Sequence, residues 1–334
     1  MQKMKKTIAL MLSAALLLLC LFGCANPHEQ EQKVIGTCAG RDVLYEELRY
    51  VTLSYRDKFE ATYGEGIWDN PQTAEQYRKD LENTVWEIMK NNYAVIALCQ
   101  DFMDEDQMES QSLYDSVDDK MQQLIDSYVN EADYEKDFES LYMTEHFMRF
   151  CLYVSALENE LFYILTQDLG LIEDDQMDFA DWVEEGNGVY VQHIFVQNDK
   201  GEDVAANRAK AEEARRQLIA GEKTIDQLVG SSTNEDLENT KPYYIVRDVY
   251  TKEIEAAAFT LQEAGDVSEV VEVANGFYVL VRMEENEADF VAKIPSLLKS
   301  YQWAKLEDMV NQKKREISIA LNEYGKSLDL VTLQ

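Results

Sequence analysis

The chain has 334 residues, with 64 Asp and Glu against 31 Lys and Arg, so its formal net charge is −33. Nucleic-acid affinity rests on cationic side chains that displace counterions, so this charge argues against a nucleic-acid partner and against an electrostatic hold on an anionic membrane. Hydrophobic residues make up 46% and aromatic residues 10%, which excludes a wholly disordered chain, and the length suggests two domains. With only 14 Gly and 4 Pro, long helices and few tight turns are expected.

The first 23 residues have the layout of a secretory signal peptide. A lysine-rich start precedes an apolar run from Ile8 to Leu19, which is too short for a comfortable membrane span. The following Leu21-Phe22-Gly23-Cys24 resembles a bacterial lipobox, which implies removal of residues 1–23, lipidation (palmitate included) of Cys24, and a polar tether over residues 24–33. An ordinary secretion signal with an incidental cysteine remains the alternative.

Three cysteines remain beyond Cys24, namely Cys38, Cys99 and Cys151. An odd number in an exported protein leaves at least one free thiol. Cys99 and Cys151 fall on apolar faces of predicted helices, which favours buried thiols over a disulfide framework. The three histidines are scattered without metal-ligand spacing, so we expect no metal and no cofactor.

Residues 34–185 are predicted to be almost entirely helical. A first helix is expected over 42–63, and Thr73-Ala-Glu-Gln76 predicts a capping box that opens a long second helix. Apolar side chains repeat at three- and four-residue steps around 113–125 and 147–165, which predicts two more helices. The remaining carboxylates are interpreted as solvated surface.

The hydrophobic period changes after Gly186. The run Val189-Tyr-Val-Gln-His-Ile-Phe-Val196 alternates, which places His193 on one side of a strand together with Val189, Val191 and Phe195. Helices are expected over 205–220, from 224 and over 252–259, and strands over 268–273 and 277–283 around the hairpin signal Ala274-Asn-Gly276. Residues 186–285 are therefore predicted to form a β-α-α-β-α-β-β domain.

The helical pattern returns from Ala288, with Pro295 expected at a helix start. The apolar face of this tail needs a packing partner, and we expect that partner to be the N-terminal helices. The predicted fold class is therefore α+β: a discontinuous all-helical domain, residues 34–185 plus 286–334, with the smaller domain of residues 186–285 inserted into it.

This organisation resembles the extracytoplasmic foldase lipoproteins of Gram-positive bacteria, relatives of SurA-type chaperones whose inserted domain is a parvulin-type peptidyl-prolyl isomerase. Residues 34–43 are similar to the strand, glycine turn and helix start that open the chaperone domain of that family. The inserted domain carries three similar strings, Val191-Gln-His-Ile-Phe-Val196, Tyr250-Thr-Lys-Glu-Ile-Glu-Ala-Ala-Ala-Phe-Thr-Leu261 and Asn275-Gly-Phe-Tyr-Val-Leu-Val281. Their order and spacing over roughly 95 residues carry the resemblance.

The resemblance implies a catalytic pair, His193 and Tyr278, and a substrate-binding set of Tyr250, Ile254, Phe259 and Asn234. The sequence departs from the family pattern, because Tyr278 stands where a second His is usual, Ile254 replaces a pocket Phe and Tyr250 a pocket Met. The family's Gly-Gly-Asp-Leu-Gly stretch is absent. Each residue also has a structural reading: His193 as a buried strand histidine, Tyr278 as a structural hydroxyl, and Tyr250 and Phe259 as core.

The function that the resemblance implies is a membrane-anchored foldase or chaperone at the extracytoplasmic face of the cell membrane, which binds unfolded secreted polypeptides. The departures at positions 254 and 278 predict weak or absent isomerase activity. A fully active parvulin is the first alternative. A solute-binding lipoprotein is the second, although such proteins normally show βαβ lobes, which this sequence lacks. A homodimer also stays open.

Overall fold

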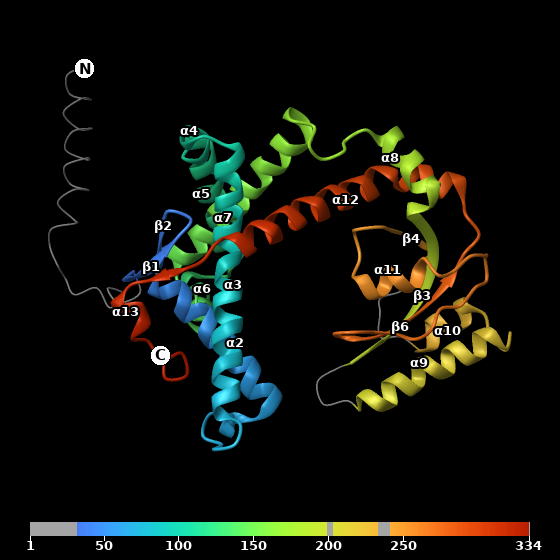
Figure 1. Ribbon diagram of the computed structural model, residues 1–334, viewed down its shortest axis with the longest axis horizontal. Coiled ribbons are helices and arrows are strands. Elements are labelled where there is room, and N and C mark those ends of the chain that lie inside the picture. Colours follow the sequence, from blue (N-terminus) through green and yellow to red (C-terminus); the bar gives the residue numbers. More distant parts are fainter. Residues whose placement is uncertain (1–31, 199–202, 233–240, 334) are drawn as a thin grey trace. The chain divides into compact units, whose positions relative to one another are not determined.

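The computed structural model describes residues 32–198, 203–232 and 241–333 (Figure 1). Their mixture of long helices and small antiparallel sheets confirms the predicted α+β class. The chain divides into two compact units, residues 1–161 with 310–334, here called the helical unit, and residues 162–309, here called the sheet unit. In the described ranges no helix combines the length and the apolar content that crossing a bilayer requires.

The helical unit is built around α2 and α3, which pack on each other (Figure 1). Leu48, Leu81, Tyr93, Ile96 and Leu157 are fully buried between its helices. Its elements are β1 (Val34–Cys38), β2 (Arg41–Leu44), α2 (Tyr45–Tyr63), η1 (Glu65–Trp68), α3 (Ala74–Phe102), α4 (Glu105–Met108), α5 (Gln111–Asp126), α6 (Glu131–Ser140), α7 (Glu145–Tyr163), β7 (Ala320–Leu321) and α13 (Glu323–Lys326).

A three-stranded antiparallel sheet, ordered β2-β1-β7, joins the two ends of the chain in the helical unit. Ala39 and Gly40 both have positive φ, which gives the tight β1–β2 hairpin its twist. A side chain at Gly36 would place its Cβ 2.6 Å from the Ala320 carbonyl oxygen, so glycine permits β7 to pair here. The predicted all-helical domain thus contains a sheet, and the first helix begins at Tyr45 instead of residue 42 because residues 41–44 pair with β1.

The long helix α3 begins at Ala74, as the sequence predicts, but without the predicted capping box. Thr73 is the N-cap residue, yet its side chain makes no capping hydrogen bond, because its backbone is not in the extended conformation that such a cap uses. The Gln76 amide instead donates to Asp80 along the helix, at 2.8 Å.

The sheet unit reproduces the predicted β-α-α-β-α-β-β order. Its four-stranded antiparallel sheet is ordered β4-β3-β6-β5, with β3 central. The preceding segment ends in η2 (Ile164–Asp168), α8 (Gln176–Trp182) and η3 (Val183–Asn187), and the order then runs β3 (Gly188–Gln197), α9 (Val204–Ile219), α10 (Ile225–Ser232), β4 (Tyr243–Val246), α11 (Lys252–Ala258), β5 (Val271–Val273) and β6 (Gly276–Arg282).

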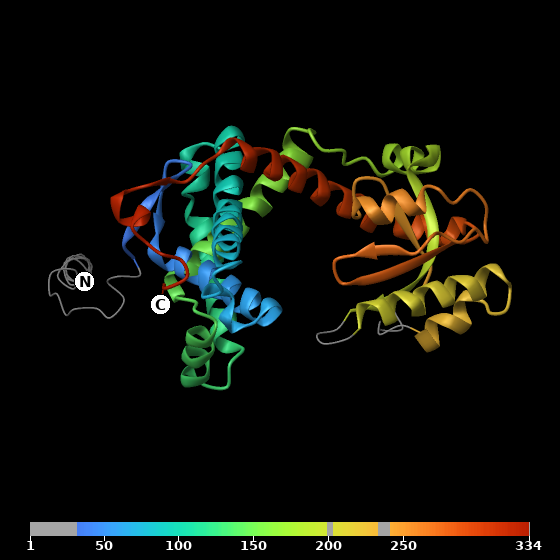
Figure 2. The ribbon, with the colours of Figure 1, turned by 60° about the horizontal axis from the view of Figure 1, so that its bottom comes forward.

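The two faces of this sheet carry different helices. One face, with Ile194 and Val196, packs against α9 and α10. The other face, with Val189 and Val191, packs against α11. Figure 2 shows the sheet between α9 on one side and α11 on the other. The predicted alternation along β3 is therefore confirmed, with His193 and Phe195 on the α11 face.

The C-terminal helix α12 (Glu287–Glu316) corrects one expectation, because Pro295 lies inside this helix and does not mark its start. Phe290, Ile294 and Leu298 pack against Phe179 of α8, and Trp303 stacks on Phe162, so the tail does contact helices of the range 34–185. The same apolar face also packs against Tyr190 and Tyr244 of the sheet, which the sequence did not predict. Only the last turns of α12 belong to the helical unit, where Lys313 pairs with Asp101 at 2.6 Å.

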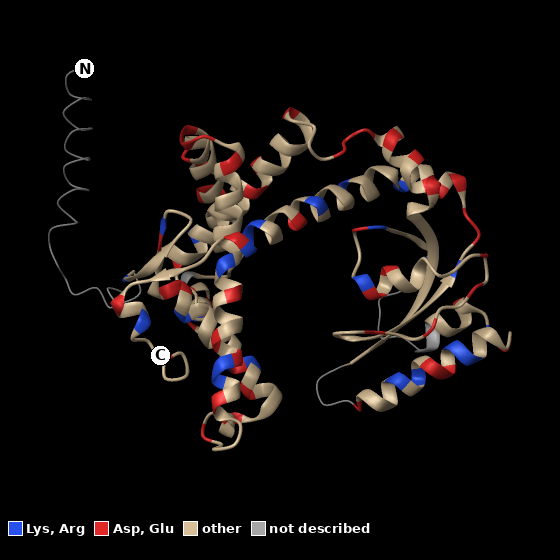
Figure 3. Ribbon diagram, in the orientation of Figure 1, with Lys and Arg blue, Asp and Glu red and all other residues tan. Residues whose placement is uncertain are grey.

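The charged residues are mixed in the described parts of both units (Figure 3). Acidic side chains occur on most helices, while basic ones gather along α9 and in the last turn of α12. Cys38, Cys99 and Cys151 are free thiols, and Cys38 and Cys99 are buried. Burial raises the pKa of Cys99 to about 12, which leaves its thiol protonated at neutral pH.

Candidate functional site

The central strand β3 places His193 on the face of the sheet that α11 covers. The His193 side chain is 6% exposed. Its ring centroid lies 5.1 Å from that of Tyr278 on β6 and 5.4 Å, edge-on, from that of Tyr243 on β4. Phe195 stacks on the other side of Tyr278, with centroids 4.4 Å apart. Three neighbouring strands thus present one imidazole between two phenol rings, which we call the His193 face.

Tyr250 extends this aromatic group from the loop before α11. Its ring centroid is 6.1 Å from that of Tyr243, and its hydroxyl donates to the Tyr244 carbonyl oxygen at 3.2 Å. The Tyr250 side chain is 37% exposed. A ring in this position is available to an incoming apolar group, although its hydroxyl is already bonded.

The two predicted pocket residues on and after α11 have different surroundings. Ile254 is 6% exposed and packs in the core with Val191 and Leu280, so it faces the sheet. Phe259 is half-buried, and the guanidinium carbon of Arg247 lies 3.8 Å from its ring centroid. The surface that Phe259 could offer to a proline ring is therefore partly covered by a cation.

The structure thus brings His193, Tyr278 and Tyr250 to one face and places Ile254 beneath it. Asn234 and Cys24 lie outside the described residues. Sequence reasoning missed Tyr243, which contacts the imidazole edge, and assigned no role to Phe195. Phe195 could have been found, because strand alternation already places it on the His193 side.

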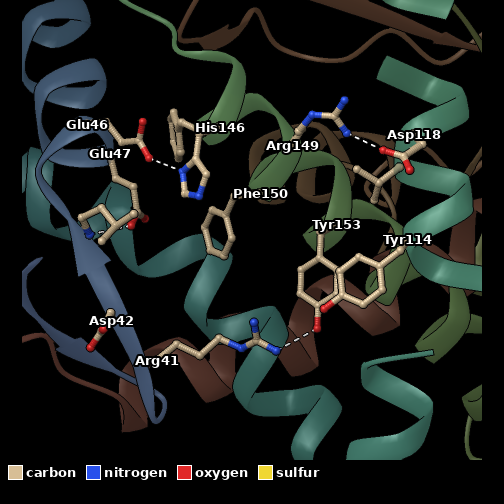
Figure 4. A pocket seen from close by; sticks show the side chains of 13 residues that line it. Arg41, Asp42, Glu46, Glu47, Tyr114, Asp118, His146, Arg149, Phe150 and Tyr153 are labelled. Atoms are coloured by element: carbon tan, nitrogen blue, oxygen red, sulfur yellow. Dashed lines mark hydrogen bonds and ion pairs between the residues drawn. The ribbon is translucent and has the colours of Figure 1, made fainter. Parts of the chain in front are cut away.

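The helical unit contains a second candidate site, a pocket of about 590 Å³ between β2, α2, α5 and α7 (Figure 4). One face of α7 forms a wall, because His146, Arg149, Phe150 and Tyr153 follow one another at three- and four-residue steps. Opposite that wall, the first turn of α2 contributes Glu46 and Glu47.

The two glutamates of this pocket are buried, which corrects the expectation that the acidic residues are all solvated surface. Glu46 is 2% exposed, accepts a hydrogen bond from the Thr144 hydroxyl and pairs with Nδ1 of His146. Glu47 is 6% exposed and accepts hydrogen bonds from the Tyr93 hydroxyl at 2.9 Å and from the Leu44 amide at 2.8 Å. Burial raises the pKa of Glu47 to about 7, against these hydrogen bonds, which lower it.

The described residues contain no cluster of three or more His, Cys, Asp and Glu side chains arranged to hold a metal ion. The His193 face offers aromatic surface and an imidazole beside a phenol, which suits apolar binding and hydrogen bonding. The pocket of the helical unit offers carboxylates beside aromatic rings.

Residues 193–284 match the rotamase family model, a PPIC-type PPIase domain. No curated protein matches the chain. Among solved structures, the foldase protein PrsA from Streptococcus pneumoniae is 14% identical and matches 85% of this chain and 93% of its own, with a TM-score of 0.36. PrsA from Bacillus subtilis is 15% identical over 86% of this chain and 91% of its own, with a TM-score of 0.27.

A structure of SurA-like chaperones from Campylobacter jejuni is 16% identical, covering 85% of this chain and 96% of that one, with a TM-score of 0.19. TM-scores below 0.5 do not define a shared fold for the whole chain, so the family match over residues 193–284 carries the assignment. It begins at His193 on β3 and runs past the end of β6. The chain therefore contains a parvulin-type domain of the PPIC class between residues 193 and 284.

Proposed function

We propose that this protein is an extracytoplasmic foldase that binds unfolded secreted polypeptides and has weak or absent peptidyl-prolyl isomerase activity. The observation that carries the proposal is a PPIC-type domain whose expected proline pocket is altered at the residues that would hold a proline ring. The chaperone part rests on this domain and on the separate helical unit that accompanies it.

Isomerisation of an X–Pro bond crosses a barrier of about 18–20 kcal/mol and takes tens of seconds or more without a catalyst. No bond has to break, so a catalyst needs to hold the proline ring and favour the twisted amide. The resemblance implies that His193 lies near such an amide, and its imidazole is 6% exposed between Tyr243 and Tyr278. Tyr278, with a reference pKa of about 10, can exchange hydrogen bonds but supplies no second imidazole near neutral pH.

The environment of Ile254 supports low activity. Its side chain is committed to the core beneath α11, so it offers little surface to a substrate. Phe259 lies under Arg247. A proline ring would therefore find Tyr250 as its main exposed aromatic partner, which gives a weaker grip than an open aromatic pocket.

Two measurements on the full chain test the proposal. It should suppress the aggregation of a reduced, unfolded protein at near-stoichiometric ratio, and a complete lack of suppression would overturn the foldase function. In a proline-limited refolding assay it should accelerate the slow phase far less than an active parvulin at the same concentration. Acceleration equal to that parvulin and lost in His193→Ala would show the fully active enzyme instead.

The lipid anchor is part of the proposal. The lipobox-like Leu21-Phe22-Gly23-Cys24 supports attachment through Cys24 to the outer face of the cell membrane. Radiolabelled palmitate should enter the wild-type chain in cells and not Cys24→Ala, which should leave the membrane fraction. Equal labelling of the two chains would contradict the anchor.

A further inference from the structure

The pocket of the helical unit has a charge pattern that selects its occupant. Its lining includes four carboxylates, those of Asp42, Glu46, Glu47 and Asp118, and two guanidiniums. Both guanidiniums already have carboxylate partners: Arg41 pairs with Glu109 and Arg149 with Asp118, each at 2.5 Å.

Arg149 has a second acidic partner, Glu145, at 3.0 Å, and Arg41 also donates to the Tyr153 hydroxyl at 2.8 Å. By contrast, neither Asp42 nor Glu47 forms an ion pair with any described residue. The two guanidiniums of the lining are therefore matched by carboxylates, and His146 pairs with Glu46. The carboxylate of Asp42, and that of Glu47 once it ionises near pH 7, are left without an ion-pair partner among the described residues. The pocket thus favours a cation.

Aromatic rings provide the rest of the wall. Phe150 lies between His146 and Tyr153 along α7, and Tyr114 of α5 stacks on Tyr153 with ring centroids 5.9 Å apart (Figure 4). A flexible hydrocarbon stem can lie on such rings while its charged end reaches a carboxylate. A volume of about 590 Å³ is in the range of pockets that enclose a ligand the size of several side chains.

We propose that this pocket binds a lysine or arginine side chain of an unfolded polypeptide together with its neighbouring residues, with the charged end directed at Glu46, Glu47 and Asp42 and the stem on Phe150, which is half-buried. This inference rests on the proposed client-binding function and names the chemistry that the helical unit selects. Among the described residues, the Glu47 carboxyl accepts hydrogen bonds from a phenol and an amide and has no ion-pair partner, so an incoming cation would engage this group. The formal charge of −33 draws such segments towards the protein.

The test uses the full chain and three fluorescein-labelled twelve-residue peptides, identical except that two central positions are Lys, Gln or Glu. Fluorescence anisotropy should give a Kd for the Lys peptide about tenfold lower than for the Gln peptide, with the Glu peptide weakest. The ratio of the Kd of the Gln peptide to that of the Lys peptide should fall at least threefold in Glu46→Gln and in Asp42→Asn, a change at an exposed residue. The Kd of the Gln peptide itself should not change in either variant. Glu82→Gln, an exposed change on α3, is the matched control and should keep the preference.

The outcomes separate this inference from the proposed function. Equal binding of the Lys and Gln peptides would overturn the cation pocket while leaving the foldase function intact. Failure to bind any peptide, together with no suppression of aggregation, would overturn the foldase function itself. Displacement of the Lys peptide by spermidine at micromolar concentration would show that a free amine, and not a polypeptide side chain, is the ligand. Circular dichroism of each variant shows whether the fold is kept. If Glu46→Gln does not fold, Asp42→Asn alone tests whether the pocket carboxylates select the Lys peptide.

Discussion

The two units of this protein assemble their candidate sites in opposite ways. In the sheet unit, the rings of His193, Tyr243 and Tyr278 come from three neighbouring strands, and pairing of the strands fixes their places. In the helical unit, the pocket draws on β2, α2, α5 and α7, and the bonded pair Arg41 and Tyr153 is separated by 112 positions in the chain. The alternation along β3 therefore predicts that His193 and Phe195 share one side of the strand, whereas the packing of distant elements creates the pocket of the helical unit.

The largest expected effect concerns the extent of the sheet unit. A fragment of residues 186–285 keeps the sheet but loses Phe179, Phe290, Ile294 and Leu298, which are all buried against it. Each such side chain contributes about 1.5–3 kcal/mol on burial, so the loss is roughly 6–12 kcal/mol, comparable with the whole stability of a domain. We expect the fragment 186–285 to be largely unfolded.

The matched fragment, residues 162–309, retains α8 and the first part of α12 and should unfold cooperatively. Chemical denaturation of the two fragments, followed by tyrosine and tryptophan fluorescence and by circular dichroism, measures the difference. Equal free energies of unfolding would place the domain boundaries at 185/186 and 285/286, as the sequence predicts, and would make the packing of Phe179 on Phe290 dispensable.

The second prediction compares the pH response of the two units. The pKa of Glu47 is about 7 in the folded helical unit and returns to its ordinary value near 4.5 on unfolding. Between these pH values the folded state holds a proton that the unfolded state has lost, so the free energy of unfolding of the helical unit falls as pH rises from about 4.5 to about 7. Glu47 accounts for roughly 3 kcal/mol of this fall in the free energy of unfolding, and its contribution is fully lost above about pH 7.

Glu47→Gln should remove this contribution, because the amide keeps an oxygen for the Leu44 amide and the Tyr93 hydroxyl but does not ionise. Its transition for the helical unit should change less between pH 5 and pH 8 than that of the wild type, while the transition of the sheet unit keeps its pH dependence. Glu82→Gln controls for the general loss of one negative charge. An unchanged slope in Glu47→Gln would show that Glu47 does not bind a proton in this range.

The sequence predicted the sheet unit well because its signals are local. The alternation along β3, the helix expected over 205–220 and the hairpin Ala274-Asn-Gly276 each depend on neighbouring residues, and the order of elements followed from them. The prediction of a helix start at Pro295 was wrong, because a proline at a helix start and a proline within a long helix share the same local pattern.

The missed features depend on distant contacts. The strand β7 has only two residues, and its partner β1 lies almost 300 positions earlier, so no local pattern indicates it. Glu46 and Glu47 look like ordinary first-turn acids of a helix, and their contacts with Thr144, His146 and Tyr93 come from residues distant in the sequence. The pocket in the helical unit could therefore not be predicted from spacing.

The smallest expected effect tests the His193 face itself. Tyr278→His would place a second imidazole, with a reference pKa of about 6.5, beside the His193 ring. Tyr278 is half-buried between His193 and Phe195, so the smaller ring fits without the overpacking that Ile254→Phe would cause in the core. One improved hydrogen bond corresponds to about 1.4 kcal/mol, so kcat/KM for X–Pro isomerisation should rise about tenfold. The control Tyr278→Phe keeps an aromatic ring without a titratable group, so its kcat/KM should not rise. An equal rise in kcat/KM in both variants would mean that the phenol hinders substrate entry and that the second imidazole has no part in activity.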